Sequence, residues 1–384
     1  MRIALARESA PGEARVAMVP ELVGGLITAG YELAVQPGAG QGAMITDDAY
    51  AAAGATITED ALQGAELIIG VQPLPAELVA GLPPGTATLS FLPYTQDLEA
   101  VRIRRDARIT SFAMDLVPRI SRAQSMDALT SQAMVSGYRG AIVAAGMLHQ
   151  FFPMSMTAAG TIPPAQVVVL GAGVAGLQAI ATARRLGAVV KGYDVRPAAA
   201  EEIASMGAIA IDLGLPPLDG AGGYAREMSE ERALLQQERL TPYLAAADAV
   251  ITTAAVPNRK PPILVTRAMI ERMKPDSVIV DLAADTGGNV EDVQPGTVTR
   301  IGQARVWGGA NVPSQLPGPA SRLYAQNVAN VIMLMTADGR FAPDPADEVV
   351  AGMCLTRDGM ITHGPAAILI DDTALIDDTR GQPR

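Results

Sequence analysis

With 384 residues, of which 49% are hydrophobic and 18% charged, the chain is long enough for two globular domains and too apolar to be disordered. Its formal net charge of −11 disfavours a nucleic-acid partner, because binding a phosphate backbone requires clustered lysine and arginine. The single cysteine, Cys354, excludes an internal disulfide, and no apolar run is clean enough for 18 residues to predict direct insertion into a membrane.

The first 110 residues alternate short apolar runs with helical patterns. Strands are predicted at residues 3–6, 32–35, 66–71 and 86–92, and the first of these makes the N-terminus a strand rather than a signal peptide. Helices are predicted from Pro20 to Gly30 and near residues 47–53, 76–81 and 98–105. This alternation is typical of an α/β domain with a parallel sheet. Because the region contains no G-x-G-x-x-G sequence, we expect it to bind no dinucleotide.

A polar cluster follows, with Arg119, Arg122, Gln124 and Asp127 on a predicted loop that opens into a helix. Ser125 is the candidate cap of that helix, which is predicted to run to about residue 152 and to cross between domains. Two arginines, an amide and a carboxylate can bind phosphate, carboxamide and ribose groups, so the loop can face a cofactor. A solvated helix start explains the same residues, and the sequence leaves both interpretations open.

The most informative stretch is residues 166–196. Its apolar start at 167–170 predicts a buried parallel strand, and residues 171–176 read Gly-Ala-Gly-Val-Ala-Gly, an intact G-x-G-x-x-G. A helix is predicted at 177–186 and a second strand at 188–193, followed directly by Asp194. This strand–turn–helix–strand setting favours dinucleotide binding over a turn that only packs.

Each glycine of this fingerprint has a physical task. Gly171 permits the tight turn, Gly173 lets a pyrophosphate approach the backbone, and Gly176 lets the helix pack closely on the strand. The phosphates would lie at the helix N-terminus, where free N–H groups favour anions. Asp194 is placed to accept hydrogen bonds from an adenosine ribose.

The remaining patterns extend this second domain into a doubly wound sheet of roughly six strands or more. Strands are predicted at 208–211, 249–253, 277–282 and 304–306, and helices at 198–206, 225–246 and 266–273. The glycine-rich loop 220–224 predicts either a mobile flap or an ordinary surface loop. An apolar helix at 321–335 should return the chain to the first domain, where residues 349–355 and 360–362 predict an edge hairpin before a frayed acidic end.

The expected fold is therefore α/β, with two Rossmann-like doubly wound parallel-sheet domains joined by long interdomain helices. The first domain is predicted to comprise residues 1–125 and 320–384. The second, predicted to bind NAD, comprises residues 130–315. We expect no metal site.

Five stretches of the chain resemble the soluble NAD(H)-binding component, domain I, of proton-translocating NAD(P)+ transhydrogenase. They are residues 11–17 (PGEARVA), 118–132 (PRISRAQSMDALTSQ), 157–190, 222–228 (GGYAREM) and 274–289. The similarity covers nearly the whole chain to about residue 365. The run PRISRAQSMD is highly specific, whereas the glycine fingerprint is shared with many dehydrogenases.

The resemblance implies a subunit that binds NAD(H) and transfers hydride to or from NADP(H) on a partner domain, coupled to proton movement across a membrane. It implies a homodimer docked on a membrane-spanning proton-channel subunit. The expected place is the cytoplasm, with peripheral association to the inner membrane through the partner subunits.

The resemblance also assigns roles to particular residues. The group that orients the nicotinamide ring for catalysis is Gln124 with Arg119 and Asp127. The other implied cofactor-binding residues are Ile120, Ser121, Arg122, Ser125, Met126, Gly171, Ala172, Gly173, Val174, Gly176, Asp194, Val195, Arg196, Gly223, Tyr224, Gln236 and Ala255. Gly223 and Tyr224 match a loop that closes over the nucleotide. Ala255 stands where related sequences tend to carry leucine, and residues 257–259 read Pro-Asn-Arg where they carry Pro-Gly-Lys.

Alanine dehydrogenase has the same fold and is the first alternative. That family uses a lysine and a histidine of its first domain for acid–base chemistry, and the corresponding positions here are Gln72 and Phe91. Neither side chain exchanges a proton near neutral pH. Direct hydride transfer between two nicotinamides moves no substrate proton, so positioning is sufficient for it.

We expect no catalytic role for the other residues of the dehydrogenase-like pattern, or for the two histidines. Arg15 and Asp285 match the dehydrogenase-like pattern, and we interpret them as inherited structural residues or as an interdomain contact. The histidines His149 and His363 are predicted to be packed or solvated. A non-catalytic NAD-sensing module is the second alternative to the enzyme.

Overall fold

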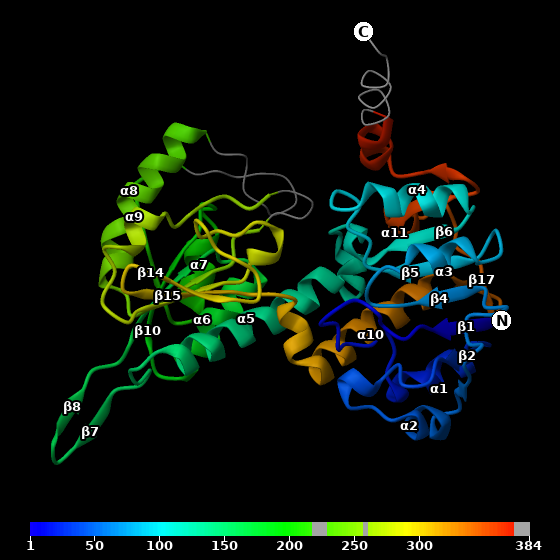
Figure 1. The fold of residues 1–384 in the computed structure, drawn as a ribbon, viewed down its shortest axis with the longest axis horizontal. Coiled ribbons are helices and arrows are strands. Elements are labelled where there is room, and N and C mark those ends of the chain that lie inside the picture. The colour runs from blue at the N-terminus through cyan, green and yellow to red at the C-terminus, as the bar shows by residue number, and fades with distance from the viewer. Residues whose placement is uncertain (217–228, 256–259, 372–384) are drawn as a thin grey trace, which may run out of the picture. The chain divides into compact units, whose positions relative to one another are not determined.

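The computed structural model describes residues 1–216, 229–255 and 260–371, which form two compact units. Unit 1 contains residues 1–132 and 316–371 of the described chain, and unit 2 contains the described residues between 133 and 315 (Figure 1). The chain leaves unit 1 within α5 (Ala128–Met147) and re-enters it just before α10 (Pro317–Leu334). Each unit has its own sheet and its own hydrophobic core.

Unit 1 is built on an eight-stranded sheet in the order β19-β18-β6-β5-β4-β1-β2-β3. Its strands are β1 (Arg2–Leu5), β2 (Glu32–Val35), β3 (Thr56–Ile57), β4 (Leu67–Ile69), β5 (Ala87–Ser90), β6 (Thr110–Ala113), β18 (Cys354–Arg357) and β19 (Met360–Ile361). All pairs among β1 to β6 are parallel, and β18 joins β6 antiparallel. The parallel strands therefore follow the doubly wound order 3-2-1-4-5-6.

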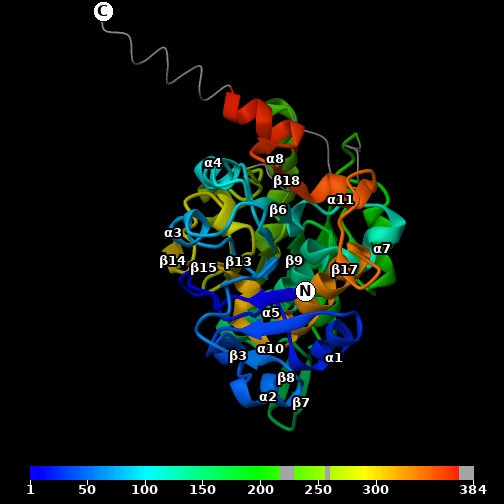
Figure 2. The same ribbon diagram turned by 90° about the vertical axis from the view of Figure 1, so that its right-hand side faces the viewer.

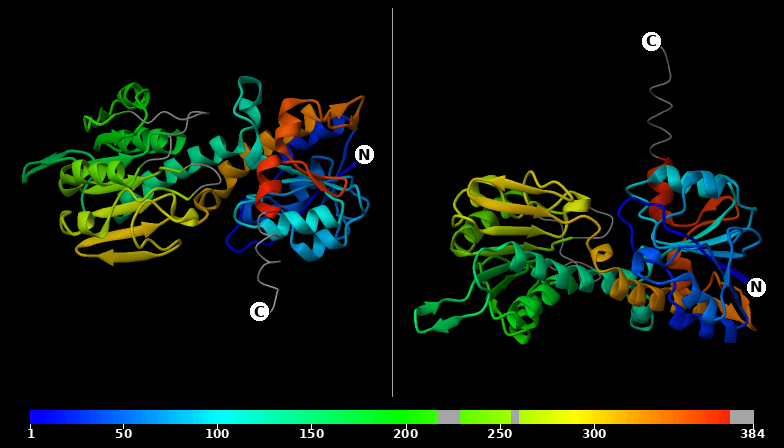
Figure 3. Two further views of the ribbon diagram at one scale, coloured as in Figure 1. Left: turned by 90° about the horizontal axis from the view of Figure 1, so that it is seen from above. Right: turned by 60° about the horizontal axis from the view of Figure 1, so that its bottom comes forward.

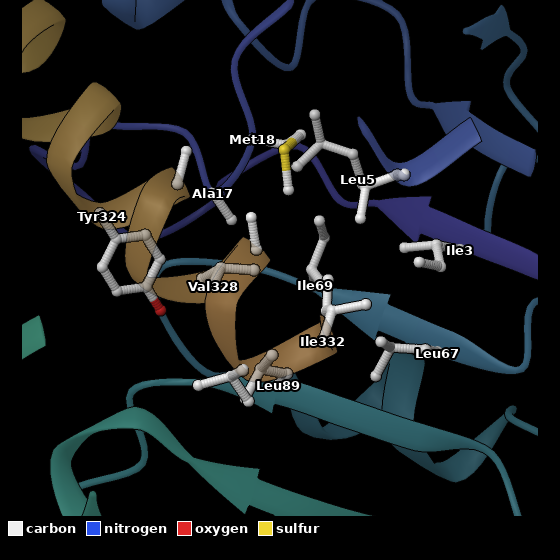
Figure 4. Close-up of a cluster of buried hydrophobic side chains, with 14 of the residues drawn as sticks. Ile3, Leu5, Ala17, Met18, Leu67, Ile69, Leu89, Tyr324, Val328 and Ile332 are labelled. Carbon is white, nitrogen blue, oxygen red and sulfur yellow. The ribbon is translucent and has the colours of Figure 1, made fainter. Parts of the chain in front are cut away.

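The strands of unit 1 present alternate side chains to two packed faces. Positions 3, 5, 67 and 69 of β1 and β4 lie in the main core, and the intervening Ala4 and Ile68 lie on the opposite face. Figure 4 shows Tyr324, Val328 and Ile332 of α10 packed into the main core. The other helices are α1 (Pro20–Thr28), α2 (Asp47–Ala52), α3 (Ala76–Ala80), α4 (Leu98–Asp106) and α11 (Glu348–Met353). Figure 2 shows α3 and α4 grouped together, apart from α1 and α2.

Unit 2 is built on a seven-stranded sheet in the order β11-β10-β9-β12-β13-β15-β14. Its strands are β9 (Gln166–Leu170), β10 (Val189–Tyr193), β11 (Ile209–Ala210), β12 (Ala249–Thr252), β13 (Val278–Asp281), β14 (Val298–Ile301) and β15 (Ala304–Gly308). The β14–β15 pair is antiparallel, and the other pairs among these described strands are parallel. The helices of the unit, besides the second half of α5, are α6 (Val174–Arg185), α7 (Ala199–Ser205), α8 (Glu230–Ala246) and α9 (Arg267–Ile270).

Two small antiparallel hairpins complete the described chain. In unit 2, β7 (Ser155–Thr157) and β8 (Gly160–Ile162) project away from the sheet, as both views in Figure 3 show. In unit 1, β16 (Thr336–Ala337) pairs with β17 (Arg340–Phe341) after the end of α10. The sequence patterns predicted neither hairpin, because the strands are only two or three residues long.

The predicted α/β fold class is confirmed, and several element boundaries are corrected. α5 ends at Met147 rather than near residue 152. Residues 349–353 belong to α11, and the edge hairpin begins only at Cys354. The side chain of Asp347 accepts the N–H groups of Val349 and Val350, and this cap starts a helix despite two β-branched residues. The predicted flap 220–224 and the acidic end beyond residue 371 lie outside the described residues.

Candidate functional site

The candidate nucleotide site of unit 2 begins where β9 ends and α6 starts. Gly171 has a φ of +95°, and a Cβ there would lie 2.7 Å from Thr253 Oγ1. A Cβ on Gly176 would lie 1.8 Å from the carbonyl oxygen of Gly171. In contrast, no neighbouring atom of the described residues lies within 4 Å of a Cβ built on Gly173. The open backbone at Gly173, directly before the N-terminus of α6, therefore fits a pyrophosphate.

This turn lies where the strand order of the sheet reverses. β9 pairs in parallel with β10 on one side and with β12 on the other. α6 leads directly to β10, whereas the chain reaches β12 only after α7 and α8. The N–H of Thr253, directly after β12, donates to the carbonyl oxygen of Leu170 over 2.8 Å and holds the two carboxyl ends together. Ligands of doubly wound sheets bind at this edge.

Asp194 is fixed against the same turn. Its Oδ2 accepts the N–H of Ala172 over 2.8 Å, and its Oδ1 accepts the N–H and Nε–H of Arg196 over 2.9 and 3.0 Å. The Arg196 guanidinium also donates to the carbonyl oxygen of Ala172 over 3.1 Å and lies 3.8 Å from Glu202. The acid predicted to meet the adenosine ribose is thus tied to the glycine turn, and its arginine neighbour is held between two carboxylates. Val195 packs against the hydrophobic core instead.

Asn289 is a buried residue of this edge whose role the sequence did not reveal. Its Oδ1 accepts the N–H of Ala254 over 2.9 Å, and its Nδ2 donates to the carbonyl oxygens of Ala254 and Pro262 over 2.7 and 2.9 Å. It thereby holds the segment after β12 in place beside the glycine turn. Ala255 is exposed on this segment, and residues 256–259 lie outside the described chain. The sequence signals at Asn289 were its position after two glycines and at the end of the stretch 274–289 that carries the family resemblance.

Gln236, an implied cofactor contact, is buried on α8, where its Oε1 accepts the hydroxyl of Tyr193 over 2.9 Å. Because Tyr193 is the last residue of β10, this bond ties α8 to the strand that ends at Asp194. Gly223 and Tyr224 lie outside the described residues.

In unit 1, Arg122 and Gln124 of the polar cluster lie on a short 3-10 helix, η3 (Ser121–Met126), with Arg119 before it and Asp127 directly after it. Ala123 and Met126 are buried in the main core, and Ile120 packs against that core. The polar side chains turn outward, and those that are exposed are Arg119, Ser121, Arg122, Gln124 and Ser125.

The predicted cap of α5 is wrong. Asp127 caps the helix, because its Oδ1 accepts the N–H of Thr130 over 2.9 Å and its Oδ2 accepts the Thr130 hydroxyl over 2.6 Å. Ser125 lies within η3 and therefore cannot occupy the capping position. Arg122 also has a partner within the chain, because its guanidinium donates two hydrogen bonds to Asp347, of 2.9 and 3.0 Å. Within the described chain, no hydrogen bond reaches the side-chain amide of Gln124.

Family models match both halves of the chain. The model described as alanine dehydrogenase/PNT, N-terminal domain, matches residues 4–136, and the corresponding C-terminal domain matches residues 140–364. The chain belongs to the alanine dehydrogenase/PNT family.

Relatives from both branches of this family cover the chain. An NAD(P) transhydrogenase alpha-subunit chain from Rhodospirillum rubrum is 45% identical over 94% of this chain and 98% of its own length. Alanine dehydrogenase from Bacillus subtilis is 30% identical over 96% of this chain and 94% of its own. The crystal structure of transhydrogenase from Sinorhizobium meliloti superposes with a TM-score of 0.83 at 40% identity, over 95% of this chain and all of that one.

Gln72 and Phe91, which the sequence places at the predicted acid–base positions of the dehydrogenases, follow the carboxyl ends of β4 and β5 in unit 1. The amide of Gln72 donates to Glu13 Oε2 over 2.8 Å. Glu13 also accepts two hydrogen bonds from the Arg15 guanidinium, of 2.8 and 2.6 Å, and Arg15 Nη1 donates to Gln132 over 2.9 Å. The ring of Phe91 lies 6.0 Å from the Arg15 guanidinium carbon. An amide and a phenyl ring therefore occupy the two positions predicted to carry lysine and histidine in the dehydrogenases.

Burial and charge set the protonation of the two glutamates here. Burial raises the pKa of Glu8 to about 7, although its carboxylate accepts the N–H groups of Val71 and Gln72 over 2.6 and 3.1 Å. Burial acts on Glu13 in the same direction, but the hydrogen bonds and charge of Arg15 outweigh it and lower the Glu13 pKa to about 2. Glu13 therefore stays ionised and paired at neutral pH, and Arg15 is held as part of the fold.

The remaining candidates have partners within the described chain. Asp285 accepts the N–H of Asn311 over 2.6 Å, and burial raises its pKa. The prediction for the histidines is confirmed, since His149 is exposed beside Asp276 and His363 packs against the ring of Tyr94. Among the helices of the described chain, none is both long and apolar enough to traverse a lipid bilayer.

Proposed function

We propose that this chain is the NAD(H)-binding subunit of a proton-translocating NAD(P)+ transhydrogenase, and that hydride passes between its NAD(H) and NADP(H) on a partner domain. The observation that carries the proposal is the contrast between the two sheet edges. In unit 2 the glycine turn is open where a pyrophosphate would lie. In unit 1 the predicted acid–base positions of the dehydrogenases carry Gln72 and Phe91, which exchange no protons near neutral pH.

The nucleotide-binding component of the proposal rests on unit 2. Gly173 and the first N–H groups of α6 would bind the pyrophosphate, and Asp194 would accept hydrogen bonds from the adenosine ribose. Ala172, Gly171, Gly176 and Val174 shape the turn. Bound NADH supplies the hydride, and the chain contributes binding and orientation only.

We assign the orientation of the nicotinamide ring to Gln124, which lies within η3, and to Arg119, which lies two residues before η3; both side chains are exposed. The Gln124 amide can donate and accept hydrogen bonds at once, which suits a carboxamide or a ribose hydroxyl. Asp127 and Arg122 act on the loop rather than on the nucleotide, because their charged groups are bound to Thr130 and Asp347.

The cofactor of this chain is NAD(H), and NADP(H) belongs to the partner domain. A 2′-phosphate at the adenosine ribose would meet the carboxylates of Asp194 and Glu202. Arg196, a nearby cation that could accept the phosphate, lies between those two carboxylates. The local charge therefore disfavours the phosphorylated nucleotide.

The proposed partners are the NADP(H)-binding domain, a membrane-spanning proton-channel subunit and a second copy of this chain. They place the protein in the cytoplasm, attached peripherally to the inner membrane. The second copy is supported by the β7–β8 hairpin, whose segment 150–166 carries no charged residue in a chain with 18% charged residues. Met156 is 74% exposed on this hairpin. Two-stranded hairpins are marginal in water unless something covers them.

Reconstitution with an NADP(H)-binding transhydrogenase domain tests the proposal. Transfer between NADH and an oxidised NADP+ analogue is expected only when both proteins are present. An NAD-sensing module would bind NADH and transfer nothing, and an alanine dehydrogenase would oxidise NADH with pyruvate and ammonium instead.

A further inference from the structure

The carbonyl oxygen of Ser125, the residue that follows Gln124, receives two side-chain hydrogen bonds from one helix. Asn327 Nδ2 and Asn330 Nδ2 of α10 each donate to it over 2.8 Å. Residues three apart lie on the same helix face, so the two amides converge on one acceptor. A carbonyl oxygen has two lone pairs, and this pair of asparagines uses both.

Further hydrogen bonds fix the orientation of both amides. The Oδ1 of Asn327 accepts the hydroxyl of Ser131 on α5 over 2.7 Å, and Asn330 Oδ1 accepts Nε2 of Gln326 over 3.0 Å. Each amide therefore has its oxygen satisfied and its nitrogen directed at Ser125. Asn327 is 7% exposed, which makes an alternative partner from solvent costly to reach.

The two asparagines complete a set of anchors around Gln124. Arg122, two residues before it, is bonded to Asp347, and Asp127, three residues after it, caps α5. Ala123 is buried in the main core. Contacts within unit 1 thus hold Arg122, Ala123, Ser125 and Asp127, whereas the Gln124 side chain is exposed to solvent.

We propose that Asn327 and Asn330 are positioning residues for hydride transfer, which fix Gln124 by binding the carbonyl group next to it. This inference rests on the proposed function. Neither asparagine touches the nucleotide in this role. They act through the backbone of η3, and a displacement of a few tenths of an ångström at Gln124 is enough to slow a reaction that depends on alignment alone.

Asn330→Asp tests the inference, because aspartate has the same shape but replaces the donor with a carboxylate facing the Ser125 carbonyl. With saturating NADH and an NADP(H)-binding domain, the transfer rate should fall about tenfold or more. The dissociation constant for NADH should change less than about twofold, because unit 2 binds the adenosine and pyrophosphate end. Asn330→Ala, which removes the donor without adding charge, should give a smaller loss of the same kind.

A double-mutant cycle separates positioning from a general structural role. In a Gln124→Ala background, Asn330→Asp should have little further effect on the rate, since the residue it positions is gone. Arg322→Ala is the control, because Arg322 is a highly exposed residue of the same helix, paired on the surface with Glu21. The Arg322→Ala variant should leave the hydride-transfer rate and the NADH affinity unchanged.

The outcomes are distinct. Independent, additive losses from Gln124→Ala and Asn330→Asp, or a full wild-type rate in both Asn330 variants, would overturn the inference while the proposed function stands. A wild-type chain that binds NADH and transfers no hydride would refute the proposed function and the inference with it. Amide hydrogen exchange across residues 121–126 gives a readout without turnover, and it should speed up in Asn330→Asp but not in Arg322→Ala.

Discussion

The side-chain amide of Gln72 donates a hydrogen bond of 2.8 Å to Glu13 Oε2, and Glu13 in turn holds the guanidinium of Arg15. Gln72, at one of the two predicted acid–base positions of a dehydrogenase, is thus included in a polar network. Glu13 is ionised and paired, so neither it nor Gln72 can shuttle a proton at neutral pH.

We therefore expect no alanine dehydrogenase activity from the purified chain. NADH should not be oxidised in the presence of pyruvate and ammonium, and the absorbance at the reduced nicotinamide band should stay constant. Measured binding of NADH in the same preparation provides the control for a folded protein. Turnover at rates typical of enzymes, on the order of 1 per second or faster, would contradict this prediction.

Glu8 should make the protein less stable as the pH rises through the neutral range. Its pKa is about 7 in the folded chain against 4.5 for the free side chain, so between these values the folded state binds more protons than the unfolded state. Stability then falls as the pH rises, by about 3 kcal/mol over the whole window. Glu8→Gln removes this dependence.

The melting temperature of Glu8→Gln should accordingly match the wild type near pH 4 and exceed it near pH 8. Glu77→Gln, which changes an exposed glutamate of α3, is the matched control and should not alter the pH profile. Glu13 contributes the opposite trend at lower pH, because its lowered pKa stabilises the fold above about 4.5, a contribution lost toward pH 2. A wild-type profile parallel to that of Glu8→Gln would contradict the assignment.

Two glycines of the fingerprint should respond differently to alanine. Gly176→Ala forces a methyl group to within 1.8 Å of the Gly171 carbonyl oxygen and should lower the free energy of unfolding by about 2 kcal/mol or more. Gly173→Ala meets open space and should leave stability unchanged, yet weaken NADH binding about tenfold by blocking the pyrophosphate. Thermal unfolding and equilibrium titration measure the two effects. Unchanged NADH affinity in Gly173→Ala would place the pyrophosphate elsewhere.

The chain should bind NADH more tightly than NADPH, because Asp194 and Glu202 would repel a 2′-phosphate. Asp194→Ser should reduce this preference. Asp212→Ser, which changes an exposed acid after the neighbouring strand β11, is the control. Titrations followed by nucleotide fluorescence measure the affinities of each protein for NADH and NADPH. Equal wild-type affinities for the two nucleotides would be incompatible with the proposed cofactor.

The local features of the fold were readable from the sequence, and the long-range contacts were not. Strand 32–35 was predicted to the residue, because its apolar run encodes it locally. Glycine spacing located the glycine turn, although α6 begins at Val174 rather than at residue 177. The network of Gln72, Glu13 and Arg15 joins residues 59 positions apart, and nothing in the local pattern shows that an amide meets a buried acid. The Asn327 and Asn330 bonds span more than 200 positions, so only the folded chain reveals them.

Helix capping explains two of the local predictions that were wrong. Ser125 and Asp127 are both good capping residues. Which of them caps α5 depends on where η3 ends, and no periodic sequence pattern predicts η3. Val349 and Val350 favour a strand by composition, but the Asp347 side chain starts a helix at this point. In both cases a side-chain carboxylate two or three residues before the bonded N–H decided the outcome.

Gln124→Asn should separate rate from affinity at the nicotinamide end. Asparagine keeps the amide but is shorter by one methylene, so its hydrogen bonds no longer reach the same place. The hydride-transfer rate in the reconstituted pair should fall about tenfold or more while the NADH dissociation constant changes less than about twofold. Gln63→Asn, at an exposed glutamine elsewhere in unit 1, is the control. A loss confined to affinity would make Gln124 a binding residue and remove it from the reaction.

The most direct test of transhydrogenase function follows the hydrogen itself. NADH carrying deuterium at the transferable position of its nicotinamide ring is mixed with this chain, an NADP(H)-binding domain and oxidised NADP+ analogue in ordinary water. Direct transfer predicts that the reduced analogue carries the deuterium, with no loss to solvent, and that no reduction occurs when either protein is omitted. Reduced analogue that carries solvent hydrogen, or no reduction at all with NADH demonstrably bound, would contradict the account.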